Sequence, residues 1–288
     1  MVEINTGPYL FQMGSFILSW HGLFSLIAVG SAVFLVGRWA TLIKMSPDDI
    51  YSIAVWAIIG GIIGARLVHV IDNLGGDNGY LNSPEKIIAI WSGGIGVWGG
   101  ILGGFLGGVI ACRVMKYPLG LVADLTAPAM LFAQSVGRLG DIVNGEHCAH
   151  ETGLFLGFVW THFQSAAGYC ARGIGFSVHP VIAYEILWNF VALLIIWNLR
   201  WRMKPSGMLF ALYLALYAIG RFVISFYRED RVWIAGLQEA HFIALFVLLL
   251  VVPLLAYKAR IGDPSVVESE ITEIVPRDTR AERRRGRH

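Results

Sequence analysis

Apolar residues fall in long, nearly uninterrupted blocks along this chain. A block of about 20 apolar residues is long enough to cross the hydrocarbon core of a bilayer as a helix. The sequence contains about seven such blocks, at residues 15–36, 51–70, 94–114, 119–136, 180–199, 207–227 and 240–257. The fourth contains Asp124 and Pro128, so it is either a full span or a broken, re-entrant segment. The pattern predicts an all-α integral membrane protein of about seven transmembrane helices.

The composition agrees with this fold class. Hydrophobic residues make up 56% of the 288 residues and charged residues only 15%, whereas a soluble globular domain carries roughly 25% charged residues. The first 15 residues contain Glu3 and no Lys or Arg, so they lack the positive region of a cleaved signal peptide. The first apolar block is therefore expected to remain as a permanent span.

Basic residues cluster after alternate blocks. They follow the first, third, fifth and seventh blocks, at Arg38, Lys44, Arg113, Lys116, Arg200, Arg202, Lys204, Lys258 and Arg260. The intervening segments are poorer, since residues 1–15 have no basic residue and residues 72–93 have only Lys86. Because short cytoplasmic loops are enriched in Lys and Arg, we expect the N-terminus outside and the C-terminus in the cytoplasm. The protein is expected to be a multi-pass component of the cytoplasmic membrane.

The last part of the chain differs from the rest. Residues 261–288 hold no apolar run long enough to bury, and they end in the basic cluster Arg283, Arg284, Arg285 and Arg287. We expect a membrane domain over residues 1–260, followed by a charged, disordered cytoplasmic tail beside anionic membrane lipid. A tail tethered to a membrane argues against a nucleic-acid partner.

Four arginines lie within or at the edge of the apolar blocks: Arg66, Arg138, Arg221 and Arg228. A charged side chain at the centre of a span costs roughly 2.5–3.5 kcal/mol on insertion scales, so each needs a compensating role. The expected topology puts all four in the outer half of the membrane. They are either interfacial anchors that reach the headgroups or a pocket whose guanidinium groups bind phosphate oxygens. An anionic phospholipid is the ligand that such a pocket would meet first.

The most distinctive string is Gly-Arg-Leu-Gly-Asp-Ile-Val-Asn-Gly-Glu at residues 137–146. It resembles the signature of the prolipoprotein diacylglyceryl transferase family, and supporting strings follow in that family's order. They are Ser19-Trp20-His21-Gly22, Gly64-Ala65-Arg66-Leu67, Trp91-Ser92-Gly93-Gly94 with Gly99-Gly100, His179-Pro180 with Tyr184-Glu185, and Gly220-Arg221-Phe222 through Phe226-Tyr227-Arg228. The resemblance covers roughly residues 15–257 and includes the number and orientation of the spans.

The resemblance implies an enzyme that transfers the diacylglyceryl group of phosphatidylglycerol to the lipobox cysteine of a preprolipoprotein signal peptide and releases glycerol phosphate. This chemistry requires no metal or redox cofactor. Arg138 and Arg221 match the family's essential arginines, and we expect them to hold the phosphate while Glu146 orients one of them. The phospholipid site is expected to include further residues, namely Arg66, Trp98, Gly99, Gly100, Asn144, Tyr184 and Arg228.

This chain departs from the family pattern at several positions, some of which the family uses for chemistry. Asp141 stands where the family has Asn, His21 where it has Tyr, and Trp98 where it has His. Further departures are Ala149 for Gly, Ser225 for an acid, and Ala240-His241 for Gly-Gln. The thiol proton is left with three candidate acceptors, which are His21, Asp141 and the substrate phosphate. Alternatively, the chain is a divergent member that binds phospholipid without enzymatic transfer, or a transferase with a different acceptor.

The longest outer segment, residues 145–177, is expected to be an arm that lies over the pocket and guides a peptide. His147, Cys148 and His150 occur in it, but they lack the spacing of a standard zinc site, so no metal is expected. Cys148 and Cys170 lie in a disulfide-permissive compartment, where they are either bridged or free. Cys112, near the inner end of a span, is expected to be a packed thiol.

Overall fold

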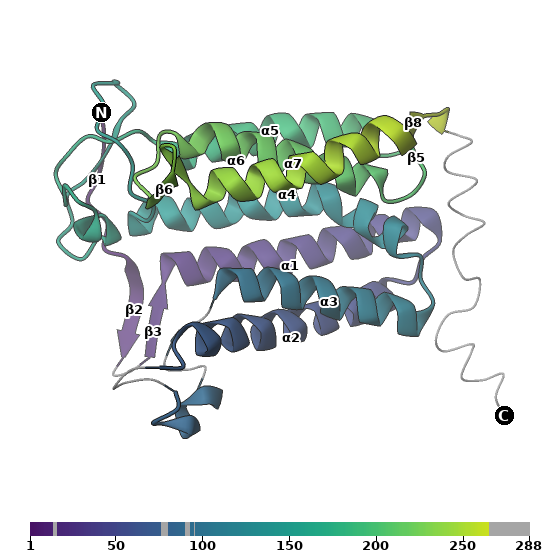
Figure 1. Cartoon of the computed structure of the whole chain (residues 1–288), viewed down its shortest axis with the longest axis horizontal. Coiled ribbons are helices and arrows are strands. Elements are labelled where there is room, and N and C mark those ends of the chain that lie inside the picture. The colour runs from purple at the N-terminus through teal and green to yellow at the C-terminus, as the bar shows by residue number, and fades with distance from the viewer. Residues whose placement is uncertain (14–15, 76–79, 90–92, 95, 265–288) are drawn as a thin grey trace. The chain divides into compact units, whose positions relative to one another are not determined.

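The computed structural model describes residues 1–13, 16–75, 80–89, 93–94 and 96–264. Within these residues, seven helices are long and apolar enough to cross a membrane. They are α1 (Trp20–Ala40), α2 (Pro47–Asp72), α3 (Val97–Met115), α4 (Leu119–Asn144), α5 (Val181–Leu199), α6 (Met208–Ser225) and α7 (Glu239–Lys258) (Figure 1). The prediction of an all-α multi-pass membrane protein is confirmed. The predicted tail lies, from residue 265 onward, outside the described residues.

Short strands and single helical turns join the helices. The strands pair as β1 (Val2–Ile4) with β4 (Phe158–Trp160), β2 (Tyr9–Met13) with β3 (Phe16–Ser19), β5 (Met203–Lys204) with β8 (Arg260–Ile261), and β6 (Val232–Ile234) with β7 (Leu237–Gln238). The first pair is parallel and the other three are antiparallel. The 3₁₀ turns are η1 (Thr41–Ile43), η2 (Pro84–Ile88) and η4 (Ala166–Tyr169). The helices supply most of the buried core, and β4 adds Phe158 and Trp160.

The structure corrects two expectations about span boundaries. The first span begins at Trp20 rather than near residue 15, because the apolar residues before it form β3 and pair with β2. The fourth is one helix as far as Asn144, so the alternative of a broken segment is wrong. Asp124 inside this helix has a structural role, since its carboxylate accepts the backbone N–H groups of Gly207 and Phe210 at 2.6 and 2.8 Å. It caps the first turn of α6, where N–H groups lack helical partners.

Contacts divide the described chain into two units, and each is treated by itself. Unit 2 is Val36–Val122, and unit 1 is Met1–Leu35 together with residues 123–264. In unit 2, α2 and α3 pack through glycines: a Cβ on Gly64 would overlap the carbonyl oxygen of Gly99. Small residues at such contacts let helix backbones approach closely in lipid.

In unit 1, glycines set the distance between the helices that carry the charged residues. The buried apolar core of this unit includes Leu131, Ile196 and Tyr213. A Cβ on Gly140 of α4 would lie 2.8 Å from the Cα of His21 in α1. One on Gly220 of α6 would overlap the indole ring of Trp188 in α5. Glycine at these two positions therefore permits close contact of α4 with α1 and of α6 with α5.

The two ends of unit 1 carry different elements. At one end, β5 and β8 pair Lys204 with Arg260. At the other end lie β1, β6 and the loop after α4 (Figure 1). The start of α1, the end of α4, the start of α5 and the end of α6 also meet at this second end, because consecutive helices alternate in direction. This end holds the candidate site.

Candidate active site

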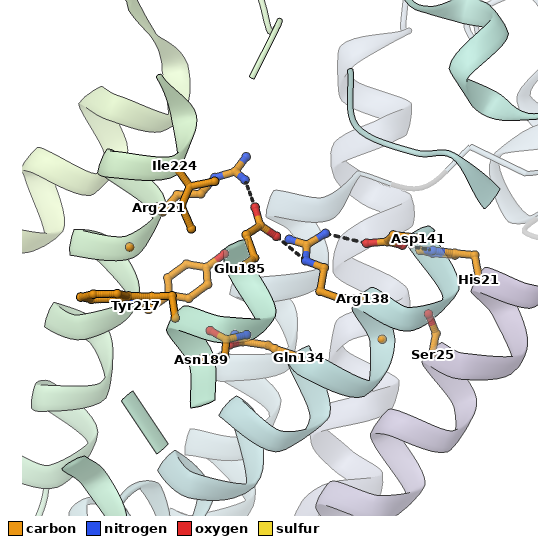
Figure 2. Close-up of a pocket in the computed structure, with 13 residues that line it drawn as sticks. His21, Ser25, Gln134, Arg138, Asp141, Glu185, Asn189, Tyr217, Arg221 and Ile224 are labelled. Atoms are coloured by element: carbon orange, nitrogen blue, oxygen red, sulfur yellow. Dashed lines mark hydrogen bonds and ion pairs between the residues drawn. The ribbon is translucent and has the colours of Figure 1, made fainter. Parts of the chain in front are cut away.

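Unit 1 contains a cavity of about 200 Å³ between α1, α4, α5 and α6. Its ionisable lining residues are His21, Arg138, Asp141, Glu185 and Arg221. Figure 2 shows these side chains joined in one row, from Arg221 through Glu185, Arg138 and Asp141 to His21. A concave site with a few convergent polar groups is a candidate for ligand binding. The structure thus brings together five residues from four helices.

Glu185 is the carboxylate that holds the arginines together. Its Oε2 lies 2.5 Å from Nε of Arg138, and its Oε1 accepts from Nη1 of Arg221 at 2.9 Å. Nη1 of Arg228 lies 3.6 Å from the same Oε1. Only 9% of the Glu185 side chain is exposed, so solvent screens these pairs weakly. One buried carboxylate therefore faces three guanidinium groups.

Asp141 connects this group to two histidines. Its Oδ2 accepts from Nη1 of Arg138 at 2.7 Å and lies 3.2 Å from Nε2 of His147. Its Oδ1 lies 2.6 Å from Nδ1 of His21. The close approach at Gly140 makes the second contact possible, because it brings the end of α4 against the start of α1. Two departures from the family pattern, at positions 21 and 141, are thus in direct contact.

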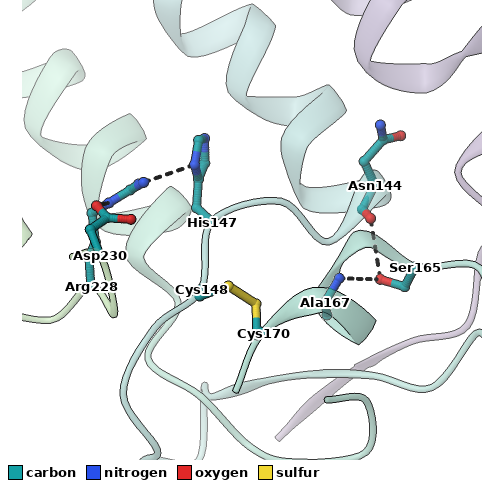
Figure 3. Close-up of a disulfide and its surroundings, with 8 residues drawn as sticks. All are labelled: Asn144, His147, Cys148, Ser165, Ala167, Cys170, Arg228 and Asp230. Carbon is teal, nitrogen blue, oxygen red and sulfur yellow. Dashed lines mark hydrogen bonds and ion pairs between the residues drawn. A yellow bond between two sulfur atoms is a disulfide. The ribbon is translucent and has the colours of Figure 1, made fainter. Parts of the chain in front are cut away.

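Arg228, directly after α6, is held from several sides. Its Nε donates to Oδ2 of Asp230 at 2.8 Å, and its Nη2 lies 3.0 Å from Nδ1 of His147 (Figure 3). Its carbonyl accepts from Gln238 at 2.7 Å. Burial opposes ionisation of Asp230, but the hydrogen bond and charge of Arg228 outweigh it and lower the pKa of the Asp230 carboxyl. Asp230 therefore remains a carboxylate at neutral pH and neutralises Arg228.

The arginines near the cavity are paired, yet they keep donors for a ligand. Three guanidinium groups face three carboxylates, those of Asp141, Glu185 and Asp230. A guanidinium has five N–H donors, and among contacts between described residues Arg221 donates from Nη1 alone. Arginines that serve only as interfacial anchors extend their charged ends into water, whereas these arginines contact acids inside the protein. The arrangement favours the other interpretation, in which the guanidinium groups are preoriented donors for an anion.

The carboxylate that contacts Arg138 and Arg221 is that of Glu185, not that of Glu146. Within the described part of the chain, Glu146 contacts no arginine: its Oε1 accepts from Asn144 at 3.0 Å, and its Oε2 lies 3.6 Å from Nδ1 of His21. The physical reason is position, since Glu146 follows the end of α4, whereas Glu185 lies in the second turn of α5 and lines the cavity. Glu146 and Asn144 therefore lie near the end of the row that is formed by His21.

Four residues of the expected phospholipid site belong to unit 2: Arg66, Trp98, Gly99 and Gly100. Their part in lipid binding stays a prediction. Arg66 has local partners, since its guanidinium donates to the backbone carbonyls of Ile87, Gly93 and Gly94 at 2.8, 2.7 and 2.8 Å. These carbonyls compensate its charge inside unit 2, and Gly99 is occupied by its contact with Gly64.

Tyr184 lies next to Glu185 in sequence but is not part of the cavity lining. Its hydroxyl is 3.2 Å from Nδ1 of His179, and both rings contact the ring of Tyr227. Burial, with a smaller effect of His150, lowers the pKa of His179, so this imidazole is neutral at neutral pH. The role of Tyr184 in phospholipid binding stays a prediction.

Several uncharged residues also line the cavity without having been singled out in the sequence: Ser25, Gln134, Trp188, Asn189 and Tyr217. A single uncharged side chain inside an apolar block does not by itself indicate a site. Helical spacing does indicate one, because residues four apart share a helix face. Gln134, Asn189 and Tyr217 each lie four residues along a helix from a charged residue of the cavity.

A disulfide joins Cys148 and Cys170, whose Cα atoms are 5.4 Å apart (Figure 3). Of the two states left open for these cysteines, the structure has the bridged one. A bridged Cys148 offers no thiolate, and both ring nitrogens of His147 face charged side chains. These residues therefore do not form a metal-ligand set with His150. Cys112 is a buried thiol, as expected.

Comparison with known proteins identifies the family of this chain. The family described as prolipoprotein diacylglyceryl transferase matches residues 8–257. A phosphatidylglycerol–prolipoprotein diacylglyceryl transferase of Dehalococcoides mccartyi is 32% identical over 90% of this chain and 96% of its own length. Proteins of the same name from Rhodococcus jostii and a Nostoc species are 33% and 31% identical, over 89% and 84% of this chain and 75% and 85% of theirs. The chain belongs to the prolipoprotein diacylglyceryl transferase family.

Proposed function

We propose that this protein transfers the diacylglyceryl group of phosphatidylglycerol to the lipobox cysteine thiol of preprolipoproteins and releases glycerol phosphate. A sulfur–carbon bond forms at the glycerol carbon of the diacylglyceryl group, and the bond from that carbon to the phosphate oxygen breaks. Family membership and the names of the relatives support these substrates. The observation that carries the proposal in this chain is the cavity in which Glu185 joins Arg138 and Arg221.

Arg138 and Arg221 are the residues proposed to hold the phosphate. As the carbon–oxygen bond breaks, negative charge grows on the phosphate, and preoriented donors that face this charge lower the barrier. Glu185 holds the two guanidinium groups in place before the lipid arrives, so little reorganisation is needed during the reaction. Arg228 does not line the cavity, but its guanidinium lies 3.6 Å from Glu185 and adds positive charge on the protein side of that carboxylate.

The cavity is proposed to face the outside of the cytoplasmic membrane. In unit 1 it lies at the end opposite β5 and β8, whose basic residues favour the cytoplasmic side. The bridge between Cys148 and Cys170 supports the same orientation, because disulfides persist in oxidising compartments. Phosphatidylglycerol of the outer leaflet and an exported signal peptide would then both reach the cavity, with the loop at residues 145–177 guiding the peptide.

A reconstituted assay tests this function. Purified protein in phosphatidylglycerol nanodiscs is mixed with a lipobox peptide, and both glycerol phosphate and lipidated cysteine are measured. We expect equal amounts of the two products, and neither when the peptide carries Ser in place of its cysteine. Arg138→Gln and Arg221→Gln should each lower the rate roughly 10²–10³-fold, since each removes donors to the developing charge. Arg260→Gln, at an exposed arginine of β8 whose guanidinium donates to the carbonyl of Ala259, is the matched control.

A second candidate is a member of the family that binds phospholipid without transfer or uses a different acceptor. Trp98 favours this alternative, because it stands where the family has a histidine. Bound phosphatidylglycerol with no release of glycerol phosphate would establish binding alone. Release of glycerol phosphate with an unmodified lipobox peptide would point to another acceptor.

A further inference from the structure

We infer that His21, oriented by Asp141, accepts the proton of the attacking thiol, an inference that rests on the proposed function. A free cysteine has a pKa of about 8.5, so only a small fraction is thiolate at neutral pH. An apolar setting disfavours the thiolate further. A base within reach of the cavity would therefore accelerate the reaction. The structure offers one such base beside the phosphate-binding arginines.

The pair has the geometry of an oriented base. Nδ1 of His21 lies 2.6 Å from Oδ1 of Asp141, so the carboxylate accepts a hydrogen bond from Nδ1–H and the ring keeps its lone pair on Nε2. A buried carboxylate fixes the tautomer of a catalytic histidine in the same way in serine proteases. The His21 side chain is 45% exposed and that of Asp141 only 4%. Within the described residues Nε2 has no hydrogen-bond partner, so it is the accessible basic atom.

Asp141 also links this base to the phosphate-binding group. Its second oxygen accepts from Nη1 of Arg138 at 2.7 Å, and Figure 2 shows His21 and Arg138 approaching the carboxylate from opposite sides. Both residues line the same cavity. A thiol at Nε2 of His21 and a phosphate at Arg138 would therefore be neighbours, as the displacement requires.

The surrounding acids stabilise the charge that His21 gains. The thiol proton moves to Nε2, the sulfur lone pair forms the sulfur–carbon bond, and the electrons of the carbon–oxygen bond leave with the phosphate. The resulting imidazolium faces Asp141 at 2.6 Å and Oε2 of Glu146 at 3.6 Å. It then returns its proton to the leaving phosphate monoester, whose second pKa is about 6, or to water. No oxidant or metal is needed to balance this step.

Other titratable groups of the cluster are less suited to the role. His147 has a charged partner at each ring nitrogen. Glu185 has an arginine at each carboxylate oxygen. Asp141 has a hydrogen-bond partner at both oxygens, one of them His21 itself. His21 is the member of the cluster that combines an orienting partner with an accessible basic atom.

The substitution His21→Gln tests the inference. Gln can still hydrogen-bond to Asp141 but cannot take up a proton near neutral pH. At pH 7 and saturating phosphatidylglycerol, kcat should fall roughly 10²–10⁴-fold, with KM for the lipid nearly unchanged. The residual rate should rise about tenfold per pH unit up to the pKa of the thiol, because solvent then supplies the thiolate. His69→Gln, at a histidine of α2 outside the cavity lining, is the matched control.

Glu146→Gln provides a second test that does not depend on replacing His21. Removing the carboxylate 3.6 Å from the imidazole should move the acid limb of the wild-type kcat profile to lower pH. If Glu146 had only a structural role, Glu146→Gln would lower the rate equally at every pH and leave the acid limb in place. That result would overturn the inference.

The remaining outcomes separate the inference from the proposed function. If wild type transfers and His21→Gln keeps its rate and profile, the inference fails and the proposed function stands. If wild type gives no transfer, both fail. The ligand atoms of His21, Asp141 and Glu146 lie within 4.8 Å of one another, so a chelator is included. Loss of wild-type activity with chelator, restored by a divalent ion, would overturn the base in favour of a metal site.

Discussion

Replacing Glu185 by Gln tests whether the cavity is built for a phosphate. The substitution keeps the shape of the side chain but removes the charge that lies 2.5 Å from Arg138 and 2.9 Å from Arg221. The two guanidinium groups then lose their shared counterion in a poorly screened setting. A phosphate bound between them would restore the missing negative charge. We therefore expect a variant that is less stable than wild type but gains more stability from phosphatidylglycerol.

The size of the effect follows from the geometry. At an effective dielectric constant of about 20, one attraction at 2.9 Å is worth roughly 6 kcal/mol before desolvation. Removing one partner of a buried ion pair costs roughly 3–5 kcal/mol in measured cases. At about 2 °C per kcal/mol for a chain of this length, Tm should fall by roughly 6–10 °C in neutral lipid. Phosphatidylglycerol should recover roughly half of this loss, because its phosphate accepts from the same donors.

Thermal unfolding in phosphatidylcholine nanodiscs, with and without phosphatidylglycerol, measures both quantities. Glu151→Gln is the matched control, because Glu151 pairs with Arg172 at 2.8 Å but its side chain is 52% exposed, and exposed pairs are worth roughly 0–1 kcal/mol. The control should unfold within about 2 °C of wild type. A Glu185→Gln variant that unfolds with wild type, or that gains no more from phosphatidylglycerol than wild type does, would refute the reasoning.

Three further predictions concern stability. Cys148→Ser with Cys170→Ser should cost roughly 2–4 kcal/mol, because the bridge spans a sequence separation of 22 residues, and reduced wild type should unfold at the same temperature as the double variant. Asp124→Ala should cost about 1 kcal/mol through loss of the cap on α6, with transfer per folded molecule unchanged. The lowered pKa of Asp230 means that its pair with Arg228 stabilises the fold fully above about pH 4 and is lost as pH falls through the folded-state pKa. The Tm difference between wild type and Asp230→Asn should therefore shrink on acidification from about pH 4, and a constant difference would contradict this account.

The spans could be predicted from the sequence because bilayer thickness fixes the length of an apolar helix. The start of the first span could not, since the apolar residues of β3 have the composition of a helix and their partner strand β2 is not apparent from periodicity. The continuity of the fourth span could not be predicted either, because the partners of Asp124 are not apparent from the sequence. These partners are backbone N–H groups of α6, distant in sequence, and no local pattern identifies them.

The arginines of the site were predictable as a set, but their partners were not. Their cost inside a span required a compensating group, and for Arg138, Arg221 and Arg228 the structure supplies acids. Glu146 follows Arg138 in the same string, yet the helix ends between them and the carboxylate turns toward His21. The partner of both Arg138 and Arg221 comes from α5 instead. Proximity in sequence was therefore a poor guide wherever a helix terminus intervenes.

The glycines beside the charged residues are a sequence signal for close contact between helices. An ionisable group inside a span is tolerated where a partner helix comes close, and a neighbouring glycine permits that approach. Gly140, next to Asp141, brings α1 and its His21 within reach, and Gly220 brings α5 against α6 beside Arg221. Gly137, next to Arg138, differs, because a Cβ there would meet nothing within 4 Å and the residue lines the cavity. Gly220 also lines the cavity, so a glycine beside a charged residue marks this site both where helices are in close contact and where the space is open.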